Sequence, residues 1–196
     1  ATCAKAASAI SEGLARNAVA AKINGTLCDL SHVLCEGDKL EIVTLKDKEG
    51  LEVYRHTCAH VLAQAVKTIF PTCKLAIGPV IENGFYYDFD FNTPITQDDF
   101  VKIEAEMAKI IKANTPITRF ELPREEAIKL MSEYDEKYKV ELINDLPEDS
   151  VISFYKQGTF TDLCRGPHLP STGKIKAFKL VSIAGAYWRG NEKNKM

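Results

Sequence analysis

The sequence predicts an α+β fold, in which helices and short antiparallel strands follow one another along the chain. Hydrophobic residues make up 45% and charged residues 27% of the 196 residues, as in ordinary globular proteins. Apolar residues recur at helical spacing in three segments, and two dipeptides with a strong turn preference separate short apolar runs. The three segments are residues 4–17, 51–70 and 97–113, and the two dipeptides are Asn24-Gly25 and Gln157-Gly158.

The first fifty residues predict a small α+β module. Residues 4–17 have helical spacing, with Ala7, Ile10 and Leu14 on one stripe. Two strands joined by Asn24-Gly25 follow, and then an alternating strand, KLEIVTL. The charged turn KDKEG places the module boundary near residues 46–50.

The rest of the chain predicts a larger unit of mixed helices and strands. The helix 51–70 ends before Pro71, and GFYYDFDF alternates as a strand with an aromatic face. That face carries Phe85, Tyr87, Phe89 and Phe91. Further elements are a helix at 97–113, a helix in PREEAIKLMSEY, a hairpin in VISFYKQGTFTDLC and one or two strands in KAFKLVSIAGAYW.

Charge and cysteine content limit the possible functions. A net charge of −2 excludes a wholly basic nucleic-acid binder, but residues 165–196 hold seven Lys/Arg against one acid, which leaves room for an anionic partner. Six cysteines without a CxxC motif indicate neither a disulfide framework nor a zinc ribbon. Without a signal peptide or a long apolar run, we expect a cytoplasmic protein, and the ends of the chain read as those of a fragment.

Two pairs of side chains carry the strongest chemical signal. His56 and His60 lie four residues apart and therefore on one face of the predicted helix. Cys164 and His168 are also four apart, and Pro167 between them requires a turn. If folding brings the pairs together, three imidazoles and a thiol form one site.

Three kinds of site fit these residue types. All four could hold a structural zinc, three of them could hold a catalytic zinc with an open position, or the pocket could hydrolyse without metal through a His or Lys. The zinc-protease motif HExxH is absent, because Thr57 stands where its Glu would be. A cysteine protease is disfavoured because no oxyanion-hole or triad signature accompanies Cys164. Spacing alone leaves the other three open.

Several motifs together resemble a known family. RHTCAH, KLAIGPVIENGFYYDFDF, YKVELI, TDLCRGPHLP and AGAYWRG closely resemble the amino-terminal editing region of bacterial-type threonyl-tRNA synthetases. The HxxxH and CxxxH pairs are also similar to the editing domains of alanyl-tRNA synthetases. The resemblance implies a TGS module, a ubiquitin-like β-grasp lacking its first hairpin, at residues 1–46. It implies an editing domain at 51–196 that ends before the aminoacylation core.

The resemblance also implies a function. An editing domain of this family hydrolyses serine from wrongly charged threonine tRNA, so the expected partner is the serine-bearing acceptor end of that tRNA. No cofactor is expected in this fragment, since ATP, magnesium and the core zinc belong to the aminoacylation core. We expect no metal in the His/Cys site and no membrane partner. We also expect a monomeric fragment of an enzyme that is a homodimer when intact.

Roles follow residue by residue from the same resemblance. His56 and Lys139 are expected to hold the attacking water and the ester or ribose oxygen, with His60 beside them. Cys164 and His168 would line the pocket, with Cys164 as a steric gate against the methyl group of threonine. The remaining candidates are Asp162 for the substrate's α-ammonium, Tyr87 for the substrate or terminal adenosine, and Lys174, Lys176, Lys179 and Arg189 for tRNA phosphates.

Two other functions remain open at this point. One is a non-catalytic tRNA-binding or scaffold fragment in which the four residues hold a structural zinc. The other is a freestanding editing factor of the alanyl type that acts in trans.

Overall fold

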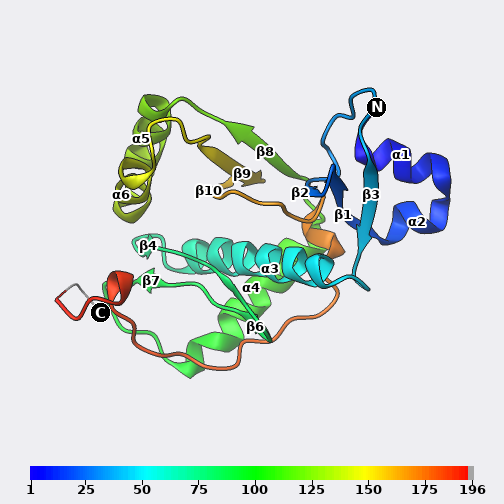
Figure 1. The fold of residues 1–196 in the computed structure, drawn as a ribbon. Helices are drawn as coiled ribbons and strands as arrows, with labels where there is room; N and C mark the ends of the chain where they lie inside the picture. The colour runs from blue at the N-terminus through cyan, green and yellow to red at the C-terminus, as the bar shows by residue number, and fades with distance from the viewer. Residues whose placement is uncertain (194–196) are drawn as a thin grey trace.

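The computed structural model describes residues 1–193 and has the predicted α+β architecture (Figure 1). A helix through the middle of the molecule, α3 (Lys48–Ile69), lies between a three-stranded sheet and another helix, α4 (Phe100–Ala113). A small amino-terminal module abuts the start of α3. The described residues contain no helix that is long and apolar enough to cross a lipid bilayer.

The amino-terminal module contains two helices where the sequence predicts one. Helix α1 (Cys3–Ile10) ends at Ser11, and α2 (Glu12–Asn17) begins directly after it. Ser11 has an extended backbone, and its hydroxyl accepts a hydrogen bond from the backbone N–H of Leu14. This N-cap favours a new helix start over continuation of the first helix.

The sheet of this module is antiparallel and has the strand order β2-β1-β3. Its strands are β1 (Ala18–Ile23), β2 (Thr26–Cys28) and β3 (Leu40–Thr44). Asn24 and Gly25 form the predicted hairpin turn with positive φ angles. Among the described residues the outer strands β2 and β3 each pair on one side only, with β1.

The two faces of this sheet contribute to different cores. Ala18 and Ala21 pack with Cys3 and Ala7 of α1 in the core of the module itself. Val19 and Val43 on the opposite face instead belong to the large central core, together with Val53 of α3 and the residues around it. The apolar core is therefore continuous across the boundary predicted near residues 46–50.

Gly50 allows the close approach of α3 to the sheet. A Cβ atom at this position would lie 1.9 Å from the backbone oxygen of Thr44, at the end of β3. No side chain fits at that distance, so the first turn of α3 rests directly on the backbone of β3. The helix accordingly begins at Lys48, before residue 51, where the sequence pattern places its start.

The second sheet covers the side of α3 that faces away from α4 (Figure 1). Its order is β10-β9-β8, and helices α5 and α6 pack against it through a core that contains Phe154 and Ile143. The hairpin between β9 and β10 turns at Gly158 and Thr159, one residue later than predicted. The bounds are β8 (Ile117–Glu121), β9 (Ser153–Gln157), β10 (Phe160–Leu163), α5 (Arg124–Glu133) and α6 (Lys137–Asp145).

The predicted continuous aromatic strand is wrong, although its aromatic face is correct. Phe85, Tyr87, Phe89 and Phe91 all contact the central core. The strand is interrupted because its pairing register shifts by one residue: Leu75 pairs with Phe89, whereas Val80 pairs with Phe85. Two short ladders remain, in which β4 (Lys74–Leu75) pairs with β7 (Phe89–Asp90) and β5 (Val80–Ile81) pairs with β6 (Gly84–Phe85).

The predicted strands in residues 176–188 are absent, and the segment is extended without a strand partner. Side chains accept its backbone N–H groups instead: the Tyr54 hydroxyl binds those of Lys176 and Ala177, and Glu104 binds that of Leu180. A 3₁₀ turn, Trp188–Gly190, ends the segment.

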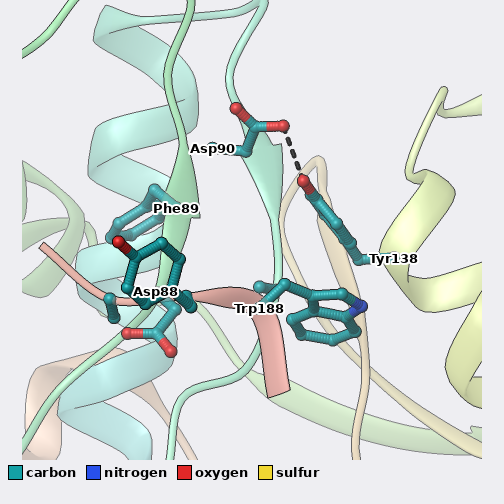
Figure 2. Close-up of a pocket in the computed structure, with 8 residues that line it drawn as sticks. Asp88, Phe89, Asp90, Tyr138 and Trp188 are labelled. Atoms are coloured by element: carbon teal, nitrogen blue, oxygen red, sulfur yellow. Dashed lines mark hydrogen bonds between the residues drawn. The ribbon is translucent and has the colours of Figure 1, made fainter. Parts of the chain in front are cut away.

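The end of this segment lies against α6. The rings of Trp188 and Tyr138 lie 4.7 Å apart beside a hollow of about 30 Å³ (Figure 2). The Tyr138 hydroxyl donates to Asp90 of β7 at 2.7 Å. This contact ties α6 to the strand pair β4/β7, which matters because the next residue on α6 is Lys139.

We expect Gly50→Ala to destabilise the protein, because the added methyl group must displace the backbone of β3 or of α3. Overpacking of this kind costs about 1–3 kcal/mol in the free energy of unfolding. Chemical denaturation measures this cost. Gly13→Ala is the matched control: Gly13 also lies in a helix, and a Cβ atom there meets no atom within 4 Å. A Gly50→Ala protein as stable as the control would contradict the close contact.

Candidate functional site

The structure brings the two pairs of the sequence into one cluster. His56 and His60 lie one helical turn apart on α3, and Cys164 and His168 lie in the loop after β10. The ring of His168 is 4.5 Å from that of His56 and 4.3 Å from that of His60. One nitrogen or sulfur atom from each of the four residues lies within 4.8 Å of the others. We call these four residues the His/Cys cluster.

The loop from Cys164 to His168 is folded tightly. Gly166 has a φ of +75°, and its backbone N–H donates to the Cys164 sulfur at 3.2 Å. A Cβ atom at Gly166 would lie 1.8 Å from the hydroxyl oxygen of Tyr155, so only glycine fits between the loop and this phenol. The loop thereby directs the side chains of Cys164 and His168 to the same side.

The thiol of Cys164 lies between two imidazoles. Its sulfur is 3.2 Å from Nε2 of His56 and 3.3 Å from Nε2 of His168. Burial raises the pKa of this thiol to about 12. At pH 7 only about one thiol in 10⁵ is then ionised, whereas a cysteine nucleophile reacts as the thiolate. The residue therefore acts as a neutral thiol.

The three imidazoles are electrically neutral at pH 7. Burial lowers the pKa of His60 and of His168 well below 6.5, and each pKa is lowered further because two adjacent protonated rings would repel each other. Burial also lowers the pKa of His56, the one histidine of the cluster that remains partly exposed. Neutral imidazoles can accept a proton or bind a metal, and both are useful chemistry at this site.

A second group of polar side chains lies beside His60. Asp162 and Lys139 are almost completely buried, and their charged groups lie 2.9 Å apart. The hydroxyl of Tyr87 donates to Asp162 at 2.6 Å and accepts from Lys139 at 2.9 Å. The Nδ1 atom of His60 is 3.7 Å from the same carboxylate. All seven residues proposed from the sequence for catalysis or substrate binding thus lie in or next to one site.

Two supporting residues were not found from the sequence. The Thr57 hydroxyl accepts the backbone N–H of Leu169 at 3.0 Å and lies 3.4 Å from Nδ1 of His168. Asp29 of the small module accepts the backbone N–H of His168 at 2.9 Å. Both are more than a hundred residues from the loop that they hold. Thr57 lies within RHTCAH, where the spacing indicates a role for the two histidines but none for this hydroxyl, and Asp29 belongs to none of the motifs found in the sequence.

The four basic residues considered for phosphate binding already have partners within the protein. Lys179 pairs with Glu104 at 2.8 Å, and Arg189 pairs with Glu141 and Asp145. The amino groups of Lys174 and Lys176 donate to backbone carbonyls of Arg16 and Gly173. Binding of phosphates by these residues would have to compete with these contacts.

Comparisons with known proteins identify both parts of the chain. Residues 1–44 match the TGS domain family, and residues 152–196 match the family described as the threonyl and alanyl tRNA synthetase second additional domain. The threonine–tRNA ligase of Clostridioides difficile is 63% identical over 190 residues, which cover 97% of this chain. The chain corresponds to the amino-terminal TGS and editing region of a threonyl-tRNA synthetase.

Other curated relatives agree with this assignment. The threonine–tRNA ligase of Clostridium tetani is 64% identical over 187 residues, and that of Acetivibrio thermocellus is 62% identical over 190 residues. These alignments cover 95% and 97% of this chain but only 29% and 30% of the relatives, and for Clostridioides difficile the share is 30%. The chain thus spans about 30% of the length of the relatives it matches.

The His/Cys cluster has donors suited to zinc, whether or not an ion binds there. One thiolate and three imidazoles make a tetrahedral set, and sulfur–nitrogen separations of 3.2 and 3.3 Å are close to those between ligands of one zinc ion. A zinc ion would have to displace the thiol proton of Cys164, whose raised pKa opposes this. Without an ion, the thiol already has the two imidazoles as hydrogen-bond partners.

We expect Asp162→Asn to destabilise the protein strongly. The change leaves the ammonium of Lys139 buried without a counter-ion, and breaking a buried pair in this way costs about 3–5 kcal/mol. Urea denaturation measures the loss. Asp145→Asn, which removes a carboxylate from an exposed pair with Arg189, is the control and should leave the transition midpoint unchanged. Equal stabilities of the two variants would contradict the role of Asp162 as the counter-ion.

We also expect stability to fall as the pH decreases below 6.5. The pKa values of His60 and His168 are lower in the folded state than in the unfolded chain. Below pH 6.5 the unfolded chain therefore binds protons that the folded protein does not, which lowers the free energy of unfolding by at most about 1.4 kcal/mol per pH unit for each histidine. Denaturation at pH 7.0, 6.0 and 5.5 tests this.

Two variants test whether the His/Cys cluster causes this loss of stability at acidic pH. His60→Asn removes one of the two groups and should make the decline shallower, whereas His32→Ala, at an exposed histidine of the small module, should preserve it. The expectation fails if the decline is the same in all three proteins.

Proposed function

We propose that this chain hydrolyses the ester bond of serine wrongly attached to threonine tRNA. Serine lacks one methyl group of threonine, and a pocket that must contact this methyl discriminates by only about 1–3 kcal/mol. An enzyme that charges tRNA with threonine therefore benefits from a second site that removes serine. The observation that carries the proposal is the His/Cys cluster, in which neutral imidazoles surround a protonated thiol.

His56 is the proposed general base. It is neutral at pH 7 and more exposed than His60 and His168, so a water molecule beside it can lose a proton to the ring. A positioned general base typically contributes a factor of about 10²–10⁴ in rate. Cys164 is not the proposed nucleophile, because a cysteine attacks an ester as the thiolate and this thiol is protonated.

Lys139 is proposed to stabilise charge, not to transfer protons. Its ammonium group is fixed between Tyr87 and Asp162 at the edge of the site. A fixed positive charge of this kind favours the negative charge that develops on the ester oxygen during attack by water. Asp162 already has Lys139 and Tyr87 as partners, so an α-ammonium group of the substrate would have to share this carboxylate with them.

Cys164 is proposed to exclude threonine. The side chain is held by His56, His168 and the backbone N–H of Gly166, and it cannot turn away without losing those contacts. A fixed sulfur atom leaves space for the hydroxymethyl group of serine and opposes the added methyl of threonine.

The proposal includes the setting of the reaction. The substrate is the acceptor end of threonine tRNA carrying serine, the hydrolysis needs no metal, and the chain works as a monomer in the cytoplasm. Charging of tRNA with ATP and threonine is assigned to the part of the relatives that this chain does not span.

A zinc-binding scaffold is the second candidate. It is favoured by one observation, the four donor atoms within 4.8 Å of one another. In that case the metal would hold α3 to the loop after β10, and its removal would unfold the protein. A freestanding alanyl-type editing factor would hold a catalytic zinc with three residues of the same cluster and leave one position open.

The test is deacylation by metal-stripped protein. Threonine tRNA charged with serine, and separately with threonine, is incubated with the protein, and the loss of each amino acid is followed. We expect the seryl ester to be lost at least a hundredfold faster than without protein, while the threonyl ester is spared. His56→Ala should slow the reaction by about 10²–10⁴, the contribution of a general base.

His32→Ala is the matched control, because His32 is exposed in the small module and distant from the cluster in sequence. It should retain full activity. Cleavage that appears only after zinc is added would establish a catalytic metal site in place of the proposed mechanism. If the seryl ester survives with and without zinc, the hydrolase function is wrong for this chain, and unfolding by chelator would then support the scaffold.

A further inference from the structure

A carboxylate of the small module reaches into the candidate site. Asp29 follows β2, and both of its oxygen atoms bind residues of the larger domain. Oδ1 accepts the backbone N–H of His168 at 2.9 Å, and Oδ2 accepts the hydroxyl of Tyr155 at 2.6 Å. Both partners belong to the part of the fold that forms the His/Cys cluster.

The loop from Cys164 to His168 packs against Tyr155. It is buried on β9, its ring lies 4.2 Å from that of His168, and its hydroxyl fills the space beside Gly166. Since Asp29 binds both the loop and this hydroxyl, one side chain fixes the loop and its support together. Bonds to a charged acceptor are stronger than bonds between neutral groups.

Fixing the backbone of His168 also fixes its ring. Nδ1 of the ring lies 3.4 Å from the hydroxyl of Thr57, and Nε2 lies 3.3 Å from the sulfur of Cys164. These contacts require the loop at its observed distance from α3. A misplacement of about 1 Å in a catalytic arrangement can cost a factor of about 10² in rate.

We propose that Asp29 is a positioning residue, through which the small module sets the orientation of Cys164 and His168. The inference rests on the hydrolase function proposed above. It gives the TGS module a part in the chemistry of the editing site, although that module contributes no side chain that touches the reacting atoms.

The attachment of the module does not depend on Asp29 alone. Lys22 pairs with Glu49 of α3 at 2.6 Å, and Lys174 donates to the backbone oxygen of Arg16. The apolar contacts of β1 and β3 with α3 add to these. Removal of Asp29 is therefore expected to release the loop while the module stays docked.

The test compares Asp29→Ala with two controls in the whole chain. Asp38→Ala removes another hydrogen-bonded carboxylate of the same module, one that binds Cys35 and Asn24 within it. Glu49→Gln weakens the ion pair of Lys22 with α3 and does not alter the loop. Amide hydrogen exchange of His168 reports on the loop, and kcat and KM for deacylation of the seryl ester report on the chemistry.

We expect Asp29→Ala to accelerate exchange at the His168 amide at least tenfold. It should lower kcat 10- to 100-fold with little change in KM, and both controls should match the unchanged protein. Asp29→Asn keeps an oxygen for the His168 N–H, so its exchange and kcat should lie near those of the unchanged protein. Tyr155→Phe removes only the second hydrogen bond and replaces Asp29→Ala if that variant does not fold.

Two results would overturn the inference. Exchange at the His168 amide that is unaffected by Asp29→Ala would mean that Asp29 does not hold the loop. Faster exchange with an unchanged kcat would mean that the contact is structural only. If the unchanged protein cleaves no ester, the hydrolase function is wrong, and the exchange measurement alone then decides whether Asp29 positions the loop.

Discussion

The fold depends on the burial of α3 on almost every side. Every residue from Thr57 to Ala63 is buried, which is two turns of helix with no solvent-facing position. A helix of this kind needs neighbours all round, and the chain supplies them as the small sheet, α4 and the second sheet with its loop. Any polar residue on this stretch must find its partners within the protein. For Thr57 and His60 these partners are residues of the candidate site, among them His168 and Asp162.

Polar groups inside such a core adopt the protonation states that burial allows. The imidazoles of His60 and His168 stay neutral, because a charged ring would lose its hydration without gaining an adequate counter-ion. Lys139 and Asp162 are both buried and lie together, so each provides the charge that the other requires. The site therefore combines uncharged imidazoles with a fixed ion pair.

Much of this arrangement follows from the sequence, for identifiable reasons. The period of the apolar residues locates α3 and α4, and the Asn24-Gly25 dipeptide locates the first hairpin, because both signals are local. Their four-residue spacing places His56 and His60 on one face of α3. It could not show that this face is covered as well, since the cover comes from residues 153–169, far along the chain.

The errors come from contacts that the pattern of apolar residues does not encode. The break at Ser11 depends on a hydroxyl that caps a new helix, and the aromatic strand is interrupted by a one-residue shift in its pairing register. Residues 176–188 have the alternation of a strand, but Tyr54 and Glu104 occupy their backbone donors. Asp29 and Thr57 act on a loop that their own neighbourhood in the sequence does not reveal. For residues 176–188 and for the loop held by Asp29 and Thr57, the deciding contacts come from residues far away in the sequence.

The contact at Gly50 has a mechanical consequence. Neighbouring domains of one chain are often joined by a flexible linker that acts as a hinge. Here the backbone of β3 and the first turn of α3 touch without an intervening side chain, and an ion pair and a shared core flank that point. A torque on the small sheet would therefore turn the axis of α3 with it, and His56 lies less than two turns further along that axis. The junction between the small module and α3 is therefore rigid and transmits rotation from one to the other.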